Sequence, residues 1–311
     1  LHLSIRRQRQ MCIRDRSGAV LSLTANGPQS LDFGCENIQT VVFGGSGVKS
    51  MTGSGFDVQE LLWIKDDAVL QANGIRIALE QNANWLEQDN GYFDPGYDYH
   101  TTYLRGTSHN ITTNTGSRFG YLQISADVTF STNIDAVYYI GLNDVVLNIG
   151  ANTLYVKENW QFDGTNSFTL NHDPGALIDF PYPGTLYFGA NGGEVYPEVR
   201  ISGGGNASFY GSIYFGEELN IDDGQLNASD VYMYFTGANG INVSNGASLA
   251  IFGSSGLNFD VGQISSDGSV LFQGWDWESF VSVTGNGFTI ESAGGSAEIG
   301  ATYTSFSGLG G

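Results

Sequence analysis

The sequence predicts an all-β chain that folds as a right-handed parallel β-helix, also called a β-solenoid. Three observations lead to this fold class. Short runs of alternating apolar and polar residues recur along the chain, corners of one to three polar residues separate these runs, and two motifs repeat at long, regular intervals. A period of two between apolar residues, combined with frequent turn residues, is typical of short β-strands.

The predicted strands are roughly four to six residues long. Residues 144–156 and 219–229 show the alternation clearly, and Asn-Gly, Asp-Gly and Gly-Ala-Asn follow such runs as corners. Gly, Asn and Asp adopt the left-handed backbone conformation that sharp corners require. Residues 57–70 also offer apolar residues near helical spacing, but they lack a clear helix cap, so we expect strands there as well.

Two motifs repeat along the chain. The first is an aromatic residue followed by Ile-Ser five and six positions later, with copies that begin at Phe119, Tyr196 and Phe259 and a weaker copy at Phe56. In the first two of these copies an apolar residue also stands three positions after the aromatic residue. The second is Asn-Trp with a Phe eight residues after the Trp, at Trp85 and Trp160. A spacing of 63 residues corresponds to three coils of about 21 residues, and the spacing of 77 residues corresponds to three coils with an insertion or to four shorter coils. We expect the core to include the apolar positions of the first motif: Leu122, Ile124, Val199, Ile201 and Ile264.

Residues 1–16 differ from the rest of the chain. Residues 6–16, RRQRQMCIRDR, hold five of the twelve basic residues, and their possible codons resemble a transposase-type sequencing adapter. A secretory signal would need an apolar run after its charges, and none is present. We interpret residues 1–16 as a translated cloning scar and expect residues 17–311 to form a single β-helix domain that is truncated at both ends.

The remaining chain is strongly acidic. Without residues 1–16, seven Lys and Arg residues stand against 31 Asp and Glu residues. Nucleic acid is not expected as a partner, because its binding depends on basic residues that neutralise phosphates. Membrane insertion is not expected either, since no apolar run approaches the length of a spanning helix. Only Cys35 remains beside Cys12 of the scar, so we expect no intrachain disulfide in the natural sequence.

The repeats resemble the low-complexity parallel β-helix repeats of large secreted bacterial surface proteins. Residues 287–308 are similar to the strand-rich segments that precede the sorting domain in such proteins from Bacteroidetes-like organisms. The resemblance covers most of residues 30–311. It implies an extracellular or cell-surface location and a mainly structural role.

Parallel β-helices also carry polysaccharide lyases and glycoside hydrolases. A hydrolase needs two carboxyl groups about 5–9.5 Å apart. Adjacent acidic pairs occur at residues 66–67, 217–218 and 222–223, but neighbours on a strand point to opposite faces, and Asp-Asp-Gly at 222–224 is typical of a corner. Seven scattered cations do not suit a lyase that acts on polyuronates.

The sequence therefore favours a non-catalytic structural or adhesive segment. A carbohydrate-active enzyme or carbohydrate-binding module on the same scaffold is the alternative. A neutral polysaccharide or a protein is the expected partner, because the acidic chain repels anionic polymers.

One acidic loop is a candidate calcium site. Asp89, Asp94 and Asp98 lie in the segment DNGYFDPGYDYH at residues 89–100, and Ca²⁺ takes six to eight oxygen ligands. The spacing matches neither the EF-hand loop nor the glycine-rich calcium repeat of solenoids. A solvated, aromatic-bearing loop is the favoured interpretation, with Ca²⁺ as the alternative.

Two tryptophans form a candidate sugar-stacking pair. Trp275 and Trp277 lie in the segment GWDWE and would share one face of a strand. Packing against a flank or cap of the solenoid is the favoured interpretation of this pair.

Overall fold

The computed structural model of the chain is built from β-strands and short corners. It describes residues 20–33, 37–97, 99–157, 159–162, 168–181, 185–187, 194–237, 239–253, 255–259, 263–273, 281–292, 296–299 and 304–309. Within these ranges there is no helix, and hence none that is long and apolar enough to cross a membrane. Strands pair in parallel with strands one coil further along the chain, as Ala207 does with Leu226 and Val270 with Ala297. The predicted β-solenoid is confirmed, and its right-handed sense stays a prediction.

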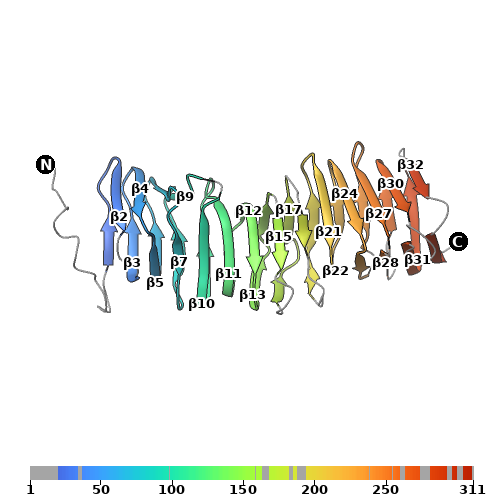
Figure 1. Cartoon of the computed structure of the whole chain (residues 1–311), viewed down its shortest axis with the longest axis horizontal. Helices are drawn as coiled ribbons and strands as arrows, with labels where there is room; N and C mark the ends of the chain where they lie inside the picture. Colours follow the sequence, from blue (N-terminus) through green and yellow to red (C-terminus); the bar gives the residue numbers. More distant parts are fainter. Residues whose placement is uncertain are drawn as a thin grey trace. The chain divides into compact units, whose positions relative to one another are not determined.

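The chain forms two compact units. Unit 1 comprises residues 1–138 and 145–148, and unit 2 comprises residues 139–144 and 149–311. Within each unit, successive coils lie side by side in the order of the sequence (Figure 1). Strands β12 (Ile134–Leu142) and β13 (Val145–Gly150) contribute residues to both units.

Unit 1 contains the first eleven strands. One four-stranded sheet has the order β2-β4-β6-β9, and the other strands belong to the large sheet. The strands are β1 (Val20–Leu23), β2 (Gln29–Phe33), β3 (Asn37–Phe43), β4 (Gly47–Gly53), β5 (Phe56–Ile64), β6 (Ala68–Gln71), β7 (Ile77–Leu79), β8 (Asn84–Glu87), β9 (Tyr92–Asp94), β10 (Thr101–Thr112) and β11 (Phe119–Phe130).

Unit 2 contains the remaining strands: β14 (Thr153–Val156), β15 (Asn159–Phe162), β16 (Phe168–His172), β17 (Leu177–Phe180), β18 (Thr185–Tyr187), β19 (Val195–Tyr196), β20 (Glu198–Ile201), β21 (Asn206–Tyr210), β22 (Ser212–Phe215), β23 (Leu219–Ile221), β24 (Gln225–Ser229), β25 (Tyr232–Phe235), β26 (Ile241–Val243), β27 (Ser248–Phe252), β28 (Gly256–Phe259), β29 (Gln263–Ser266), β30 (Ser269–Gln273), β31 (Val281–Ser292), β32 (Ser296–Ile299) and β33 (Thr304–Leu309).

Each coil in the middle of unit 2 consists of three strands. Strands β20, β21 and β22 pair with β23, β24 and β25 of the next coil, which pair in turn with β26, β27 and β28. Three strands in each coil give the unit three outward faces. Val199 pairs with Leu219 and Leu219 with Ile241, which agrees with the coil length of about 21 residues that the repeat predicts.

The core consists of the inward-pointing residues of these strands. Leu122, Ile124, Val199, Ile201 and Ile264 are each at most 1% exposed, which confirms the prediction for the first motif. Burial of one such side chain stabilises the fold by about 1.5–3 kcal/mol.

The Asn-Trp motif also builds the core. The Trp85 ring lies 5.1 Å from those of Phe93 and Phe119, and the Trp160 ring lies 6.5 Å from that of Phe168, all between centroids. In both copies of the motif, Trp therefore meets the Phe eight residues later.

Polar residues form the corners as predicted. Asp66, Asn73, Asp144 and Asp230 have φ values of 53–55°, in the left-handed region that Asn and Asp tolerate best among residues with a side chain. All three acidic pairs named above lie at or next to corners, and residues 57–64 belong to strand β5. Residues 1–16, Asp98, Trp275 and Trp277 lie outside the described residues.

Candidate functional site

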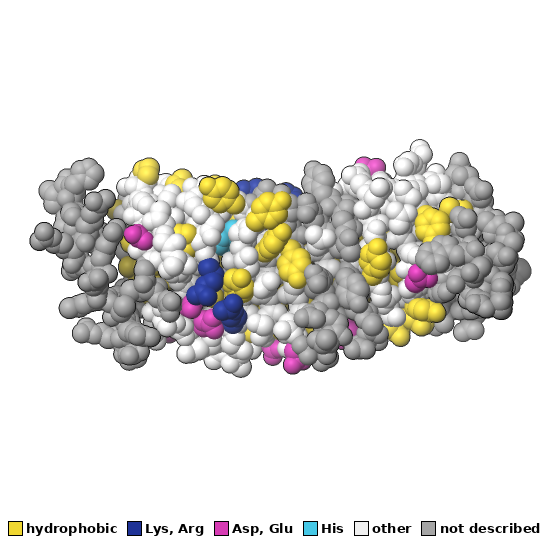
Figure 2. Space-filling model, viewed as in Figure 1, with side chains coloured by type: hydrophobic (Ala, Val, Ile, Leu, Met, Phe, Trp, Pro, Cys, Tyr) yellow, Lys and Arg dark blue, Asp and Glu magenta, His cyan; other side chains and the backbone are white. Residues whose placement is uncertain are grey.

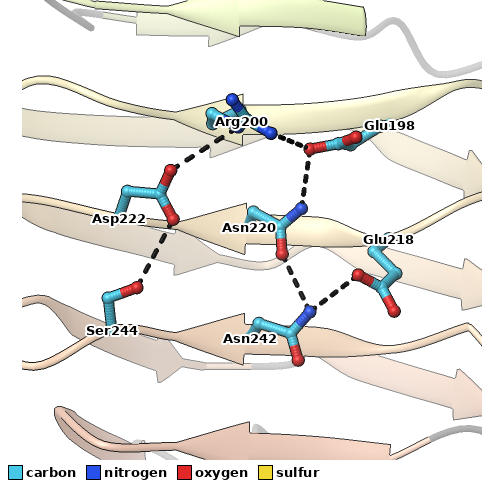
Figure 3. A network of polar contacts seen from close by, with 7 residues as sticks. All are labelled: Glu198, Arg200, Glu218, Asn220, Asp222, Asn242 and Ser244. Carbon is cyan, nitrogen blue, oxygen red and sulfur yellow. Dashed lines mark hydrogen bonds and ion pairs between the residues drawn. The ribbon is translucent and has the colours of Figure 1, made fainter. Parts of the chain in front are cut away.

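A polar network covers one outward face of unit 2. We call it the carboxylate ladder and define it as Asp179, Glu198, Arg200, Glu218, Asn220, Asp222, Asn242 and Ser244, most of which Figure 3 draws. Its central column runs through Asp179, Arg200, Asn220 and Asn242, which are register partners on β17, β20, β23 and β26. Strand alternation explains the face, because Val199 and Ile201 point inward while Glu198 and Arg200 point outward.

Arg200 joins two coils of the ladder. Its Nη2 atom lies 2.6 Å from Oε1 of Glu198 on the same strand, and its Nε atom lies 3.5 Å from Oδ2 of Asp222 on the next coil. Figure 3 shows Arg200 between these two carboxylates. The space between two carboxylates from neighbouring coils is therefore occupied by a side chain of the protein itself.

Asn220 and Asn242 continue the network across two further coils. The side-chain amide of Asn220 donates to Oε1 of Glu198 at 2.8 Å. The amide of Asn242 donates to Oδ1 of Asn220 and to Oε2 of Glu218, both at 2.8 Å. Each of these hydrogen bonds ties one coil to the coil before it.

Asp179 is the most deeply buried carboxyl group of the ladder. It is 7% exposed, and its Oδ1 atom has no hydrogen-bond partner among the described residues. Burial raises the pKa of this carboxyl group, while a hydrogen bond from Ser202 and the charge of Arg200 oppose the rise. A carboxyl group with a raised pKa close to other carboxyl groups is an arrangement that glycoside hydrolases use for general acid catalysis.

Unit 1 holds a second buried carboxyl group. The two oxygens of Glu87 accept hydrogen bonds from the Trp85 indole (2.9 Å), the Ser117 hydroxyl (2.8 Å) and the Asn114 backbone N–H (2.8 Å). The backbone N–H of Phe93 also donates to it, and burial raises its pKa to about 7 despite these donors. Glu87 is 2% exposed, so its geometry suits the binding of two coils to each other rather than contact with a ligand.

The predicted calcium loop is only partly described. Asp89 lies in a turn with φ 51°. Asp94 Oδ1 lies 2.9 Å from Arg118 Nη2 and accepts a hydrogen bond from the Gly96 backbone N–H at 3.1 Å. Asp94 is therefore already paired with Arg118, and calcium binding stays the alternative to a solvated loop. Within the described ranges, no three His, Cys, Asp or Glu residues cluster as metal ligands.

Aromatic side chains gather on another outward face of unit 2. We call it the tyrosine face and define it as Ser212, Tyr214, Tyr232, Tyr234 and Gly256, which are register partners on β22, β25 and β28. The Tyr214 and Tyr234 rings stack at 4.4 Å with an angle of 8° between them, and Tyr232 is 49% exposed. On the side of the molecule drawn in Figure 2, hydrophobic side chains lie in several separate groups, and basic side chains lie next to acidic ones.

Neither face was identified from the sequence. The tyrosine face leaves a weak signal, because Ser-Ile-Tyr-Phe at 212–215 recurs one coil later as Tyr-Met-Tyr-Phe at 232–235. The carboxylate ladder leaves no clear signal in the sequence, because Glu198, Asn220 and Asn242 come together only through the register of three coils. The candidate pair Trp275 and Trp277 lies outside the described residues.

A shallow hollow in unit 2 is lined by residues 169–172 with Glu194 and Val195. Its one histidine, His172, has its Nε2 atom 3.1 Å from the Val195 carbonyl oxygen, so that nitrogen is already paired with the backbone.

Comparison with known proteins found no protein-family model, no curated protein and no solved structure that matches the chain.

Proposed function

We propose that the chain is a non-catalytic structural or adhesive β-solenoid segment of a secreted or cell-surface bacterial protein. The observation that carries this proposal is the closure of the carboxylate ladder on itself. Arg200 lies between Glu198 and Asp222, and Asn220 and Asn242 bind carboxylates or each other. Polar groups arranged in this way bind coil to coil and add to the neighbour-to-neighbour stability of a solenoid.

Other charged groups support the same role. Lys49 is fully buried, and its ammonium group donates to the carbonyl oxygens of Ala25, Gly27 and Ser46 at 2.6–3.2 Å. Three acceptors match the three donors of an ammonium group. Lys49 therefore binds backbone carbonyls of the corners, and Glu87 binds side-chain and backbone donors of its own chain, as is expected of a scaffold.

The test is an assay of the whole chain on neutral polysaccharides. We expect no release of reducing ends over long incubation. Turnover of any of these polysaccharides would contradict the non-catalytic role.

A hydrolase acting on a neutral polysaccharide is the second candidate, and Asp179 is the observation that favours it. Its raised pKa and its position beside Glu198 and Asp222 suit a general acid. If this candidate is correct, Asp179→Asn should lower the rate of reducing-end release by about 100-fold or more. The matched control is Asp89→Asn, which removes one carboxylate from an exposed turn of unit 1.

A further inference from the structure

We propose that the tyrosine face of unit 2 binds a neutral polysaccharide, with Tyr232 as the surface on which a pyranose ring stacks. This inference rests on the adhesive role proposed above, and it adds the binding residues and the class of ligand.

The position of the Tyr232 ring is set by a glycine on the next coil. Tyr232 and Gly256 are register partners on β25 and β28. A Cβ atom placed on Gly256 would lie 2.7 Å from Cδ1 and 3.0 Å from Cε1 of Tyr232. The ring therefore extends across the neighbouring strand and covers the space that a side chain would fill. An aromatic ring that covers a glycine on a neighbouring strand is a known stabilising arrangement in sheets.

Gly256 is not required by its backbone conformation. Its φ lies outside the left-handed region, unlike that of Gly253 three residues earlier, which is +67°. The absence of a side chain at this position thus serves the placement of the Tyr232 ring. A ring held in one position loses little conformational entropy when a ligand binds.

Tyr214 and Tyr234 form a rigid surface beside Tyr232. Their rings stack at 4.4 Å, and the Phe215 and Phe235 rings stack at 4.7 Å in the core beneath, also at 8°. Burial raises the pKa of the Tyr234 hydroxyl, so this group stays neutral at physiological pH. A neutral phenol both donates and accepts hydrogen bonds, as sugar hydroxyls do.

The charge distribution selects a neutral ligand. The outward residues of β22 and β25 are Ser212, Tyr214, Tyr232 and Tyr234, none of them charged, in a chain whose formal charge is −20. An anionic polymer would be repelled by the charge of the whole molecule. A pyranose ring offers C–H groups to the Tyr232 ring and hydroxyls to its neighbours. Tyrosine-rich and serine-rich surfaces also bind proteins, which is a separate outcome of the test.

The test is affinity electrophoresis of the whole chain in gels that contain hydroxyethylcellulose, galactomannan, xyloglucan or laminarin, with alginate as the anionic comparison. We expect retardation by at least one neutral polysaccharide and none by alginate. Tyr232→Ala should weaken this binding about tenfold or more, as expected for an aromatic residue at the centre of a binding surface. Tyr232→Phe, which keeps the ring, should retain most of it.

Gly256→Ala is the sharpest variant, because its added methyl group moves the Tyr232 ring without removing the tyrosine from the chain. We expect it to weaken binding as much as Tyr232→Ala does. Tyr99→Ala is the matched control, since Tyr99 is 71% exposed in unit 1 and should leave binding unchanged. Thermal unfolding of each variant shows whether the fold is retained.

The proposal is overturned if none of the four neutral polysaccharides retards the protein, or if Tyr232→Ala and Gly256→Ala bind as the unchanged chain does. Retention by a protein ligand alone would also overturn it. These results leave the proposed scaffold role intact, whereas release of reducing ends would contradict that role and leave the binding surface intact.

Discussion

At the scale of single residues, His100 is a polar side chain in an apolar environment. It is 2% exposed, its ring lies 5.5 Å from that of Phe93, and neither ring nitrogen has a hydrogen-bond partner in the described part of the chain. Burial lowers its pKa to about 4, because the charged imidazolium is excluded from the core.

His100 should make unit 1 sensitive to acid. The unfolded chain binds a proton near pH 6.5 and the folded chain only near pH 4, so stability present above pH 6.5 is lost as the pH falls towards 4. The loss should reach about 3 kcal/mol. We expect the His100→Leu variant not to show this loss of stability at low pH. Urea unfolding of both proteins at pH 7.5 and pH 4.5 measures the difference, and parallel losses in the two would contradict this prediction.

Glu87 should have the opposite pH dependence. Its pKa is raised from 4.5 to about 7, so its stabilising contribution is complete below pH 4.5 and is lost as the pH rises through 7. Glu87→Gln has no such titration, and its amide group faces a backbone donor. We expect this variant to be less stable by about 1–3 kcal/mol at pH 5, with a gap that narrows towards pH 8. Denaturant midpoints at both pH values test this, and a constant gap would argue against it.

At the scale of elements, the hydrogen bonds between outward side chains of β20, β23 and β26 depend on residue type. Asn220 can donate to Glu198 and accept from Asn242 at the same time because its side chain carries both kinds of group. An aspartate at this position accepts only and would place a second negative charge against Glu198.

Asn220→Asp should therefore destabilise unit 2 by about 1–3 kcal/mol at low salt, and added NaCl should recover part of this loss. The matched control is Asn148→Asp, since Asn148 donates to the Thr129 hydroxyl in unit 1. Urea unfolding at two salt concentrations distinguishes the two variants. Equal losses in both would mean that the carboxylates of the ladder play no special part.

At the scale of the whole molecule, the dominant feature is the formal charge of −20. Repulsion among its carboxylates opposes the compact state, and salt reduces that repulsion over a screening length of about 10 Å at 0.1 M. We expect NaCl to raise the melting temperature.

We further expect CaCl₂ at matched ionic strength to raise the melting temperature by the same amount, because Asp94 already pairs with Arg118. A larger rise with calcium would instead indicate a specific site in residues 89–100. The double variant Asp94→Asn, Asp98→Asn should then abolish the additional rise. Calorimetry on the whole chain gives both values.

The carboxylate ladder and the tyrosine face are both formed by pairing between residues that are far apart in the sequence. One full coil of the chain separates Asp179 from Arg200, and another separates Arg200 from Asn220. These residues become neighbours only because successive coils pair in register. The contact of Tyr232 with Gly256 likewise joins two successive coils and depends on the length of every corner between them. A one-residue change in a corner would reverse which face each side chain occupies, so these contacts could not be derived from local pattern.

The sequence by itself determined the β-solenoid fold, the approximate coil length and the core positions of the first motif. Alternation with a period of two assigned Leu122, Ile124, Val199, Ile201 and Ile264 to the interior, and burial is a local property of each strand. The tertiary structure alone decided which outward residues meet. It placed Arg200 between two carboxylates, buried His100 and Lys49, and set Tyr232 over Gly256. The physical reason is that the hydrophobic pattern defines the inside of a coil, whereas neighbours on its outside are set by how the coils stack.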